Sequence, residues 1–397
     1  MPRGLLMAAL LLGAGTVDVA AQSLFATRGL GMPMAGVDAR ARVLGGIGVG
    51  LLGVNTTLAN PAEVAGTARR GVSAAVQPVS GTFRLADEES SGSGTRFPLV
   101  AILFPLSPRL ALSAGYTSAF EQSWGVIEEG EVLLDGRPVP TRDDIRSEGG
   151  ISQVFVGLGV AVTPSFAVGA AAGVNTGTTL RAARRTFPDS IDDLVAYDRE
   201  QRWTYNGAFA RVGMRFDPDP AVRLGVTFEV AGDLDVEGQT PDTEGATVEL
   251  PMRITAGASA LLSPTLMIAA GGERAMGGAT DGVFSTEGVT SFARDTWRFG
   301  GGLEFTGTRG GSRVYPIRLG GSYAQLPYYG TDESAASEWA FGAGIGVRFQ
   351  PTSLTSSAAI DASFERGGRS GLASPAIPDG LSESYWRFTF SLSLFGR

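Results

Sequence analysis

The sequence contains no histidine and no cysteine, and only 18% of its 397 residues are charged. A chain without these two residue types cannot form a Ser-His-Asp triad, a Cys-His dyad, a disulfide or a histidine-based zinc site. No glycine run is followed by Lys-Ser or Lys-Thr, which excludes a phosphate-binding loop. A hydrolase that uses carboxylates alone stays open, but no pair of acids stands out. We therefore expect no enzyme, no cofactor and no metal site.

The charge that is present is mainly acidic, with a net charge of -8. A net acidic chain without a basic patch is a poor binder of nucleic acid, so we expect no nucleic acid partner. Low charge, positive mean hydropathy and 57 glycines are an unusual combination for a soluble protein. The combination suits a protein whose outer surface faces lipid.

Residues 1–21 have the pattern of a secretory signal peptide. Arg3 supplies a positive start, residues 4–15 form an apolar core, and Val19-Ala20-Ala21 precedes the expected mature start at Gln22. The core is shorter than the ~20 residues that a transmembrane helix needs. We therefore exclude residues 1–21 from the fold and expect an exported protein.

From Gly71 onward, short connections with proline or glycine alternate with long polar ones. The long connections are expected at residues 87–95, 122–147, 183–199, 237–246, 277–292, 327–337 and 369–382. Short turns on one side and long loops on the other are typical of a transmembrane antiparallel β-barrel of the bacterial outer membrane. The pattern predicts an all-β fold of about 14 strands, roughly at residues 71–86, 96–105, 109–121, 148–163, 165–182, 200–217, 221–236, 247–262, 265–276, 293–307, 313–326, 338–350, 353–368 and 383–395.

Residues 154–174 carry no charge and are long enough to span a membrane as a helix. Pro164 lies in the middle of this stretch, and glycines are spread through it. Both residue types oppose a helix interior, so two strands joined by a tight turn at Pro164 are the better interpretation.

Apolar residues recur at every second position of the later segments, for example in 222–231, 248–259, 293–305 and 383–395. This period of two predicts strands with one face toward lipid and one toward the lumen. Charged residues share the lumen face with many small ones, and we select seven as candidate lumen charges: Arg211, Arg253, Arg298, Glu304, Arg318, Asp361 and Glu365. They could form a polar pathway or ligand anchor. They could equally form a structural ladder of ion pairs across neighbouring strands.

The glycine-rich stretch 43–66 precedes the predicted barrel and carries no charge before Glu63. It is too interrupted by glycine for a stable helix and too apolar to lie free in water. We expect residues 22–70 to plug the barrel formed by residues 71–397, although a mobile N-terminal leader stays open. The candidate plug and gate residues are Gly45, Gly46, Gly48, Gly50, Asn60 and Pro61.

The sequence resembles the FadL/TodX-type outer-membrane transport barrels and their PorV/PorQ-like relatives. The matching features are the signal peptide, the small-residue segment 41–53, the Asn60-Pro61-Ala62 before the wall, and the fourteen strands. The resemblance implies an N-terminal plug and passive uptake of hydrophobic small molecules, of the fatty acid or aromatic hydrocarbon type. In that family the ligands enter through an external groove and leave sideways at a kinked strand. The alternative is a non-transporting outer-membrane barrel that acts as a scaffold or secretion-system partner.

Two of the long polar segments, 122–147 and 183–199, mix acids with apolar residues that need a cover. Packed on a neighbouring loop, these residues would form an apolar groove with a polar rim, which suits a hydrophobic ligand. The candidate ligand entrance comprises Trp124, Ile127, Leu133, Leu134, Phe187 and Leu194. They could also simply hold the loops together. The expected partners are a hydrophobic small molecule and outer-membrane lipid, with a secretion-system protein as the partner in the alternative function.

Overall fold

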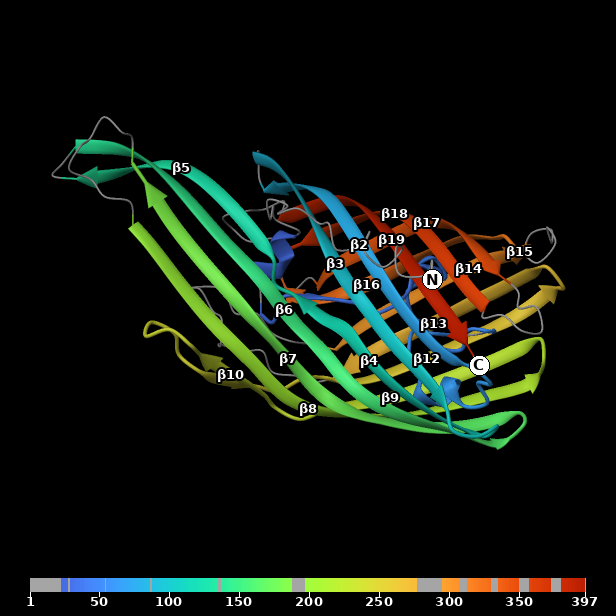
Figure 1. Ribbon diagram of the computed structural model, residues 1–397. Coiled ribbons are helices and arrows are strands. Elements are labelled where there is room, and N and C mark those ends of the chain that lie inside the picture. Colours follow the sequence, from blue (N-terminus) through green and yellow to red (C-terminus); the bar gives the residue numbers. More distant parts are fainter. Residues whose placement is uncertain are drawn as a thin grey trace, which may run out of the picture.

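Fourteen antiparallel strands form a closed barrel in the computed structural model, where the last strand pairs with the first strand of the wall (Figure 1). The structure describes residues 23–27, 29–53, 55–85, 88–134, 137–187, 197–276, 295–306, 313–329, 335–349, 357–372 and 380–396. The wall strands are β2 (Arg70–Leu85), β3 (Glu88–Pro105), β4 (Leu110–Glu121), β6 (Arg137–Thr163), β7 (Phe166–Thr186), β8 (Tyr197–Asp219), β9 (Val222–Ala231), β12 (Met252–Ser263), β13 (Leu266–Met276), β14 (Thr296–Thr306), β16 (Pro316–Tyr329), β17 (Ala335–Phe349), β18 (Ser357–Gly371) and β19 (Leu381–Gly396). The predicted fold class and strand number are confirmed.

The two faces of the wall follow the predicted alternation. On β9, Leu224, Val226 and Phe228 are exposed on the outside, whereas Thr227 and Glu229 are buried inside. The exposed side chains form the apolar band that an outer-membrane barrel presents to lipid. Val248 and Leu250, which the alternation assigns to the same lipid-facing set, are instead buried in a cluster with residues of β8 and β10 (Leu234–Gly238). Both residues precede β12, in the part of the chain that packs over the rim of the barrel.

One end of the barrel carries tight turns and both ends of the wall. Two residues join β6 to β7, β8 to β9 and β12 to β13, and each of these turns contains a proline. Gly396 pairs with Arg70 at the same end. Because short turns and chain ends lie on the periplasmic side of bacterial barrels, this end is periplasmic and the opposite end is extracellular.

The long connections on the extracellular side contain more strand than expected. Residues 122–147 hold β5 (Trp124–Leu134), which forms a hairpin with the extended start of β6, and residues 88–95 belong to β3. β7 and β8 extend beside this hairpin, and together they project beyond the barrel (Figure 1). The small strands β10, β11 (Ala246–Val248) and β15 (Arg313–Val314) complete the sheet. The expected connections at 122–147 and 87–95 therefore had the wrong bounds, because residues 88–95, 124–134 and 137–147 belong to strands.

The N-terminal segment, defined here as residues 23–69, lies inside the barrel and is mostly buried. It contains η2 (Leu24–Thr27), β1 (Met32–Pro33), α1 (Ala39–Val43) and η3 (Pro61–Val64). Asp38 caps α1 and Asn60 caps η3 through their side chains, which accept hydrogen bonds from backbone N–H groups. Among the described residues, no helix is long and apolar enough to cross a membrane.

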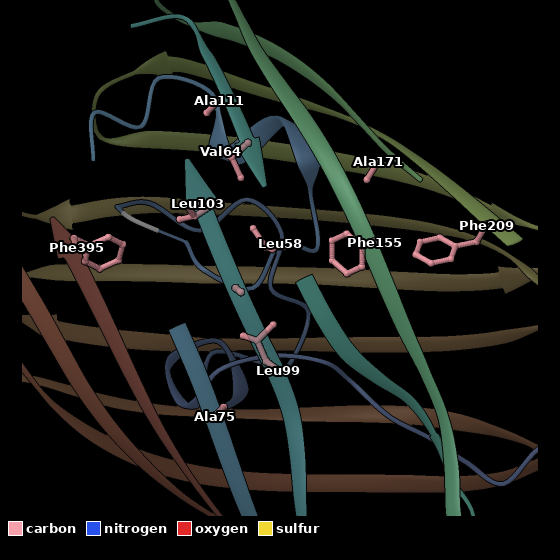
Figure 2. Close-up of a cluster of buried hydrophobic side chains, with 11 residues drawn as sticks. Leu58, Val64, Ala75, Leu99, Leu103, Ala111, Phe155, Ala171, Phe209 and Phe395 are labelled. Atoms are coloured by element: carbon pink, nitrogen blue, oxygen red, sulfur yellow. The ribbon is translucent and has the colours of Figure 1, made fainter. Parts of the chain in front are cut away.

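The main apolar core joins this segment to the wall. Leu58 and Val64 of the segment meet Leu99, Phe155 and Phe209 of three wall strands (Figure 2). The rings of Phe155 and Phe209 meet edge to face with centroids 6.0 Å apart. The segment therefore contributes two apolar side chains to the core between it and these wall strands.

Candidate functional site

Glycines of the wall face the backbone of the N-terminal segment. A Cβ atom on Gly169 would overlap Pro61, one on Gly257 would overlap Val49, and one on Gly300 would overlap Gly45. These inward glycines admit the segment backbone directly against the strands. The small lumen residues in the sequence thus make room for the segment.

The segment bends repeatedly to follow this surface. Gly45, Gly46, Gly48 and Gly50 have φ values of 102°, 73°, 72° and 73°. Positive φ is strained for a residue with a Cβ atom, so glycine suits these bends. A Cβ on Gly50 would also overlap the backbone of Gly257.

Ion pairs tie the segment to the wall. The guanidinium of Arg40, in α1, lies 2.7 Å from the carboxylate of Glu304, which also pairs with Arg318 at 2.7 Å and Arg348 at 3.0 Å. Arg318 in turn lies 2.6 Å from Asp361. Removing a carboxylate shared by three buried or half-buried cations costs far more than removing one from a surface pair, because it leaves uncompensated buried charge.

Other candidate lumen charges lie in two further groups. Glu365 pairs with Arg387 at 2.8 Å, and Arg211 pairs with Glu229 in the middle of the barrel. Arg253 lies 3.8 Å from Glu229. Arg298 lines an open cavity instead. All seven candidates therefore face the lumen, and most of them hold an ionic partner.

Glu63 occupies a buried polar pocket near the periplasmic end. Its carboxylate accepts hydrogen bonds from the backbone N–H of Gly50, at 2.5 Å, and from the side chain of Asn55. Burial raises the pKa of Glu63 to about 7, against the weaker opposing effects of these hydrogen bonds and of Arg223 and Arg215. This contact joins the glycine-rich bends to η3.

A cavity of 160 Å³ lies in the extracellular half of the lumen. The N-terminal segment contributes Leu30, Met34 and Ile47, and β4 contributes Phe120, while Arg298 belongs to the charged side. A larger cavity of 650 Å³ opens at the periplasmic end beside residues 65–69. No group of three or more metal-ligating side chains occurs in the described part of the chain.

The backbone pairing between β3 and β4 ends next to the first cavity, at Leu99 and Thr117. Beyond these residues, side-chain contacts join the two strands: the Arg96 guanidinium lies 3.2 Å from the Glu121 carboxylate, and the Ser118 hydroxyl donates to the Phe97 carbonyl. The upper edge of β4 pairs with β1 instead, through Phe120 and Pro33. We call this interruption of the backbone pairing, between residues 88–98 and 118–121, the β3–β4 gap. Thr117, at its lower end, and Phe120 both line the cavity.

The candidate entrance residues are not gathered into one groove. Trp124 is half-buried at the barrel rim, where its ring lies 5.8 Å from the guanidinium of Arg181. Ile127 and Leu133 are 53% and 75% exposed along β5, and Phe187 is half-buried after β7. Leu134 ends β5 without a described side chain, and Leu194 lies outside the described residues.

The plug candidates Asn60 and Pro61 lie against β8 and β7. The amide of Asn60 donates to the backbone carbonyl of Met214 at 2.9 Å. The sequence analysis did not select Arg40, Arg42 or Glu63. The sequence did contain a signal for these three residues. An ionisable residue in an apolar segment that is enclosed by the barrel needs a buried partner, so such residues are candidates for contacts with the wall.

Solved structures with this architecture are similar over nearly the whole chain. A FadL homologue from Pseudomonas aeruginosa is 14% identical and has a TM-score of 0.60, covering 93% of this chain and 99% of its own. The toluene transporter TbuX of Ralstonia pickettii is 16% identical with a TM-score of 0.58, covering 90% and 98%. The Pseudomonas putida toluene transporter TodX is 14% identical with a TM-score of 0.55, covering 93% and 98%. No curated protein matches the sequence.

The closed fourteen-stranded wall, which these structures match over nearly the whole chain, has the fold of a FadL-type outer-membrane β-barrel. Within this class, the family model described as BamG matches residues 3–240, and the chain belongs to the BamG family.

Proposed function

We propose that this barrel is a passive channel for hydrophobic small molecules across the outer membrane. The observation that carries the proposal is the β3–β4 gap beside the lumen cavity, because Thr117 borders the gap, Phe120 belongs to it, and both line the cavity. A ligand in that cavity has a short route through the wall into lipid. The toluene transporters of similar fold support the ligand class.

The same proposal gives the N-terminal segment the role of a gate. Gly36 lies against Thr117 and Pro98, so the segment backs the gap from inside. The cavity is closed to the periplasmic end by residues of the same segment. Sideways release needs a local movement of this backing and the opening of the Arg96–Glu121 ion pair across the gap, whereas passage along the axis needs the ion pairs of Arg40 to break.

A disulfide across the gap tests this route. Phe97 and Ser118 are neighbours there, since the Ser118 hydroxyl donates to the Phe97 carbonyl at 3.1 Å. The chain has no cysteine, so a Phe97→Cys/Ser118→Cys pair forms the sole bridge. We expect oxidation to reduce uptake of radiolabelled toluene by cells at least tenfold, and reduction to restore it.

The matched control is Leu103→Cys/Ser113→Cys, because these residues already pair across the same two strands. Its oxidation should leave uptake unchanged at equal surface abundance. Equal uptake by the oxidised and reduced gap variant would contradict a sideways route.

A scaffold or secretion-system partner that transports nothing is the second candidate. It is favoured by the close fit of the segment to the wall glycines and by the ion pairs that hold it. The same uptake measurement separates the two candidates. A wild-type protein that adds nothing to toluene or fatty acid uptake in cells lacking other such channels supports the scaffold.

A further inference from the structure

The sequence DASFERGGR, residues 361–369, forms most of β18 and has different chemistry on its two faces. On the lumen side, Asp361, Glu365 and Arg369 all hold ionic partners, the last with Glu383 at 2.9 Å. These three contacts account for the inward charges of the run. Arg366 points the other way, toward the lipid-facing side, and needs a separate explanation.

Aromatic rings of Trp386, Phe341, Phe364 and Trp339 lie around Arg366, and we call these four rings its aromatic bed. Its guanidinium carbon is 4.4 Å from the ring centroid of Trp386, and Phe341 is its register partner on the other neighbouring strand. Phe364 stacks on the same Trp386 ring with centroids 4.9 Å apart. A Cβ on Gly368 would contact the ring of Trp339 at 2.9 Å, so this glycine leaves room for a further ring. The rings shield the guanidinium from water on its flanks.

Arg366 has no acidic partner in the described part of the chain. Two other outward arginines do have one: Arg274 lies 2.6 Å from Asp295, and Arg84 lies 2.7 Å from Glu89. An unpaired charge on the lipid face is strongly destabilising at the bilayer centre of such barrels and nearly neutral close to the interface. The position of Arg366 along the membrane normal therefore decides what it can bind.

That position is the extracellular border of the lipid-facing band. Arg366 follows Ser357, the periplasmic start of β18, by nine residues. At about 3.3 Å per residue and a tilt of about 40°, this is roughly 23 Å along the membrane normal, in a band about 25 Å tall. Trp297, Trp339 and Trp386 lie near the extracellular ends of their own strands, as an aromatic girdle requires.

We infer that Arg366 and its aromatic bed bind the phosphate of an anionic glycolipid in the outer leaflet. The guanidinium offers a planar donor fork that matches phosphate, and the rings pack against the sugar or acyl groups next to it. The phosphate supplies the missing counter-charge at the depth where lipid phosphates lie. This inference does not depend on transport through the lumen.

Native mass spectrometry from micelles tests it with bisphosphorylated lipid A and the same lipid after phosphatase treatment. We expect the wild-type barrel to retain the phosphorylated lipid in preference to the treated one. Arg366→Gln should abolish the preference, and Trp386→Leu should weaken it several-fold. Heat-modifiable migration in gels checks that each variant is folded.

Arg313→Gln is the matched control, because Arg313 lies over Phe349 at 5.3 Å in the same manner but at the periplasmic end. It should retain lipid A like the wild type. Equal retention of lipid A by Arg366→Gln and wild type would overturn the inference. Equal retention of the two lipids by the wild-type barrel would also overturn it. A copurified protein bound at the Arg366 face in place of lipid would count as the same result.

Discussion

Glu63 is a carboxyl whose charge depends on pH in the neutral range. Its pKa of about 7 exceeds the usual 4.5 because burial disfavours the ionised form. The folded state therefore prefers the protonated carboxyl. The resulting stabilisation is fully present below pH 4.5, decreases as the pH rises toward 7, and is absent above it.

We expect the barrel to unfold at a temperature several degrees lower at pH 8 than at pH 5, measured by heat-modifiable migration. Glu63→Gln should remove this difference, because the amide cannot ionise and can still accept the Gly50 N–H. The chain has no histidine, so no imidazole titrates between pH 5 and pH 8 and adds to the difference in unfolding temperature. An unchanged pH dependence in Glu63→Gln would assign the effect to another group.

At the scale of single elements, the fit between β14 and the glycine bends can be tested at two adjacent positions. Gly300 faces the backbone of Gly45, whereas Gly301 faces the lipid side, and the nearest atoms to a Cβ there belong to the neighbouring wall strand, with a tight contact of 3.0 Å to the Ala269 carbonyl oxygen. A valine at position 300 leaves no room for the segment.

We expect Gly300→Val to displace the N-terminal segment and expose Arg40 and Arg42, which are only 6% exposed in the native barrel. Trypsin should then cleave the folded protein at these arginines at least tenfold faster than wild type. Gly301→Val should resist trypsin as wild type does. Equal protection of both variants would show that the segment tolerates a side chain on β14.

The wall strands were predictable because lipid on one side and lumen on the other impose a period of two. On β19, Trp386, Phe388 and Phe390 are exposed and Arg387 is buried, as the alternation requires. β5 was not predictable, because both of its faces are exposed to water. Its sequence therefore shows no alternation of apolar and polar residues. Val248 follows the alternation by residue type but lies beyond the membrane, where that rule no longer applies.

The candidate site was predictable only in part. The sequence identifies Glu304 as an inward charge from its place in β14, but its partners Arg40 and Arg348 lie 264 and 44 positions away. Such pairing depends on the three-dimensional closure of the barrel. The β3–β4 gap is likewise invisible in the sequence, because β3 keeps its strand pattern where its pairing to β4 has ended.

At the scale of the whole molecule, the projecting strands place apolar side chains far above the membrane. Ile127 and Leu133 expose 53% and 75% of their surface on β5. Exposed apolar surface costs roughly 25 cal/mol per Å² relative to burial. A hydrophobic ligand that touches these residues before it enters the barrel would cover that surface.

We expect Leu133→Ser/Leu134→Ser to reduce uptake of a hydrophobic probe several-fold, without affecting assembly or heat-modifiable migration. Glu131→Ser, two residues away on the same strand, is the control and should leave uptake unchanged. Unchanged uptake in the double variant at equal surface abundance would remove the entrance from this hairpin.

The closing contact between β2 and β19 sets an order of assembly. These strands are the first and last of the wall, so the ring cannot close before the final strand has been delivered. The N-terminal segment passes through the interior and is held there by Glu304 of β14 and by glycines of several strands. Because these contacts come from strands around the ring, they can form together only as the ring closes. We therefore expect the segment to dock while the wall closes around it.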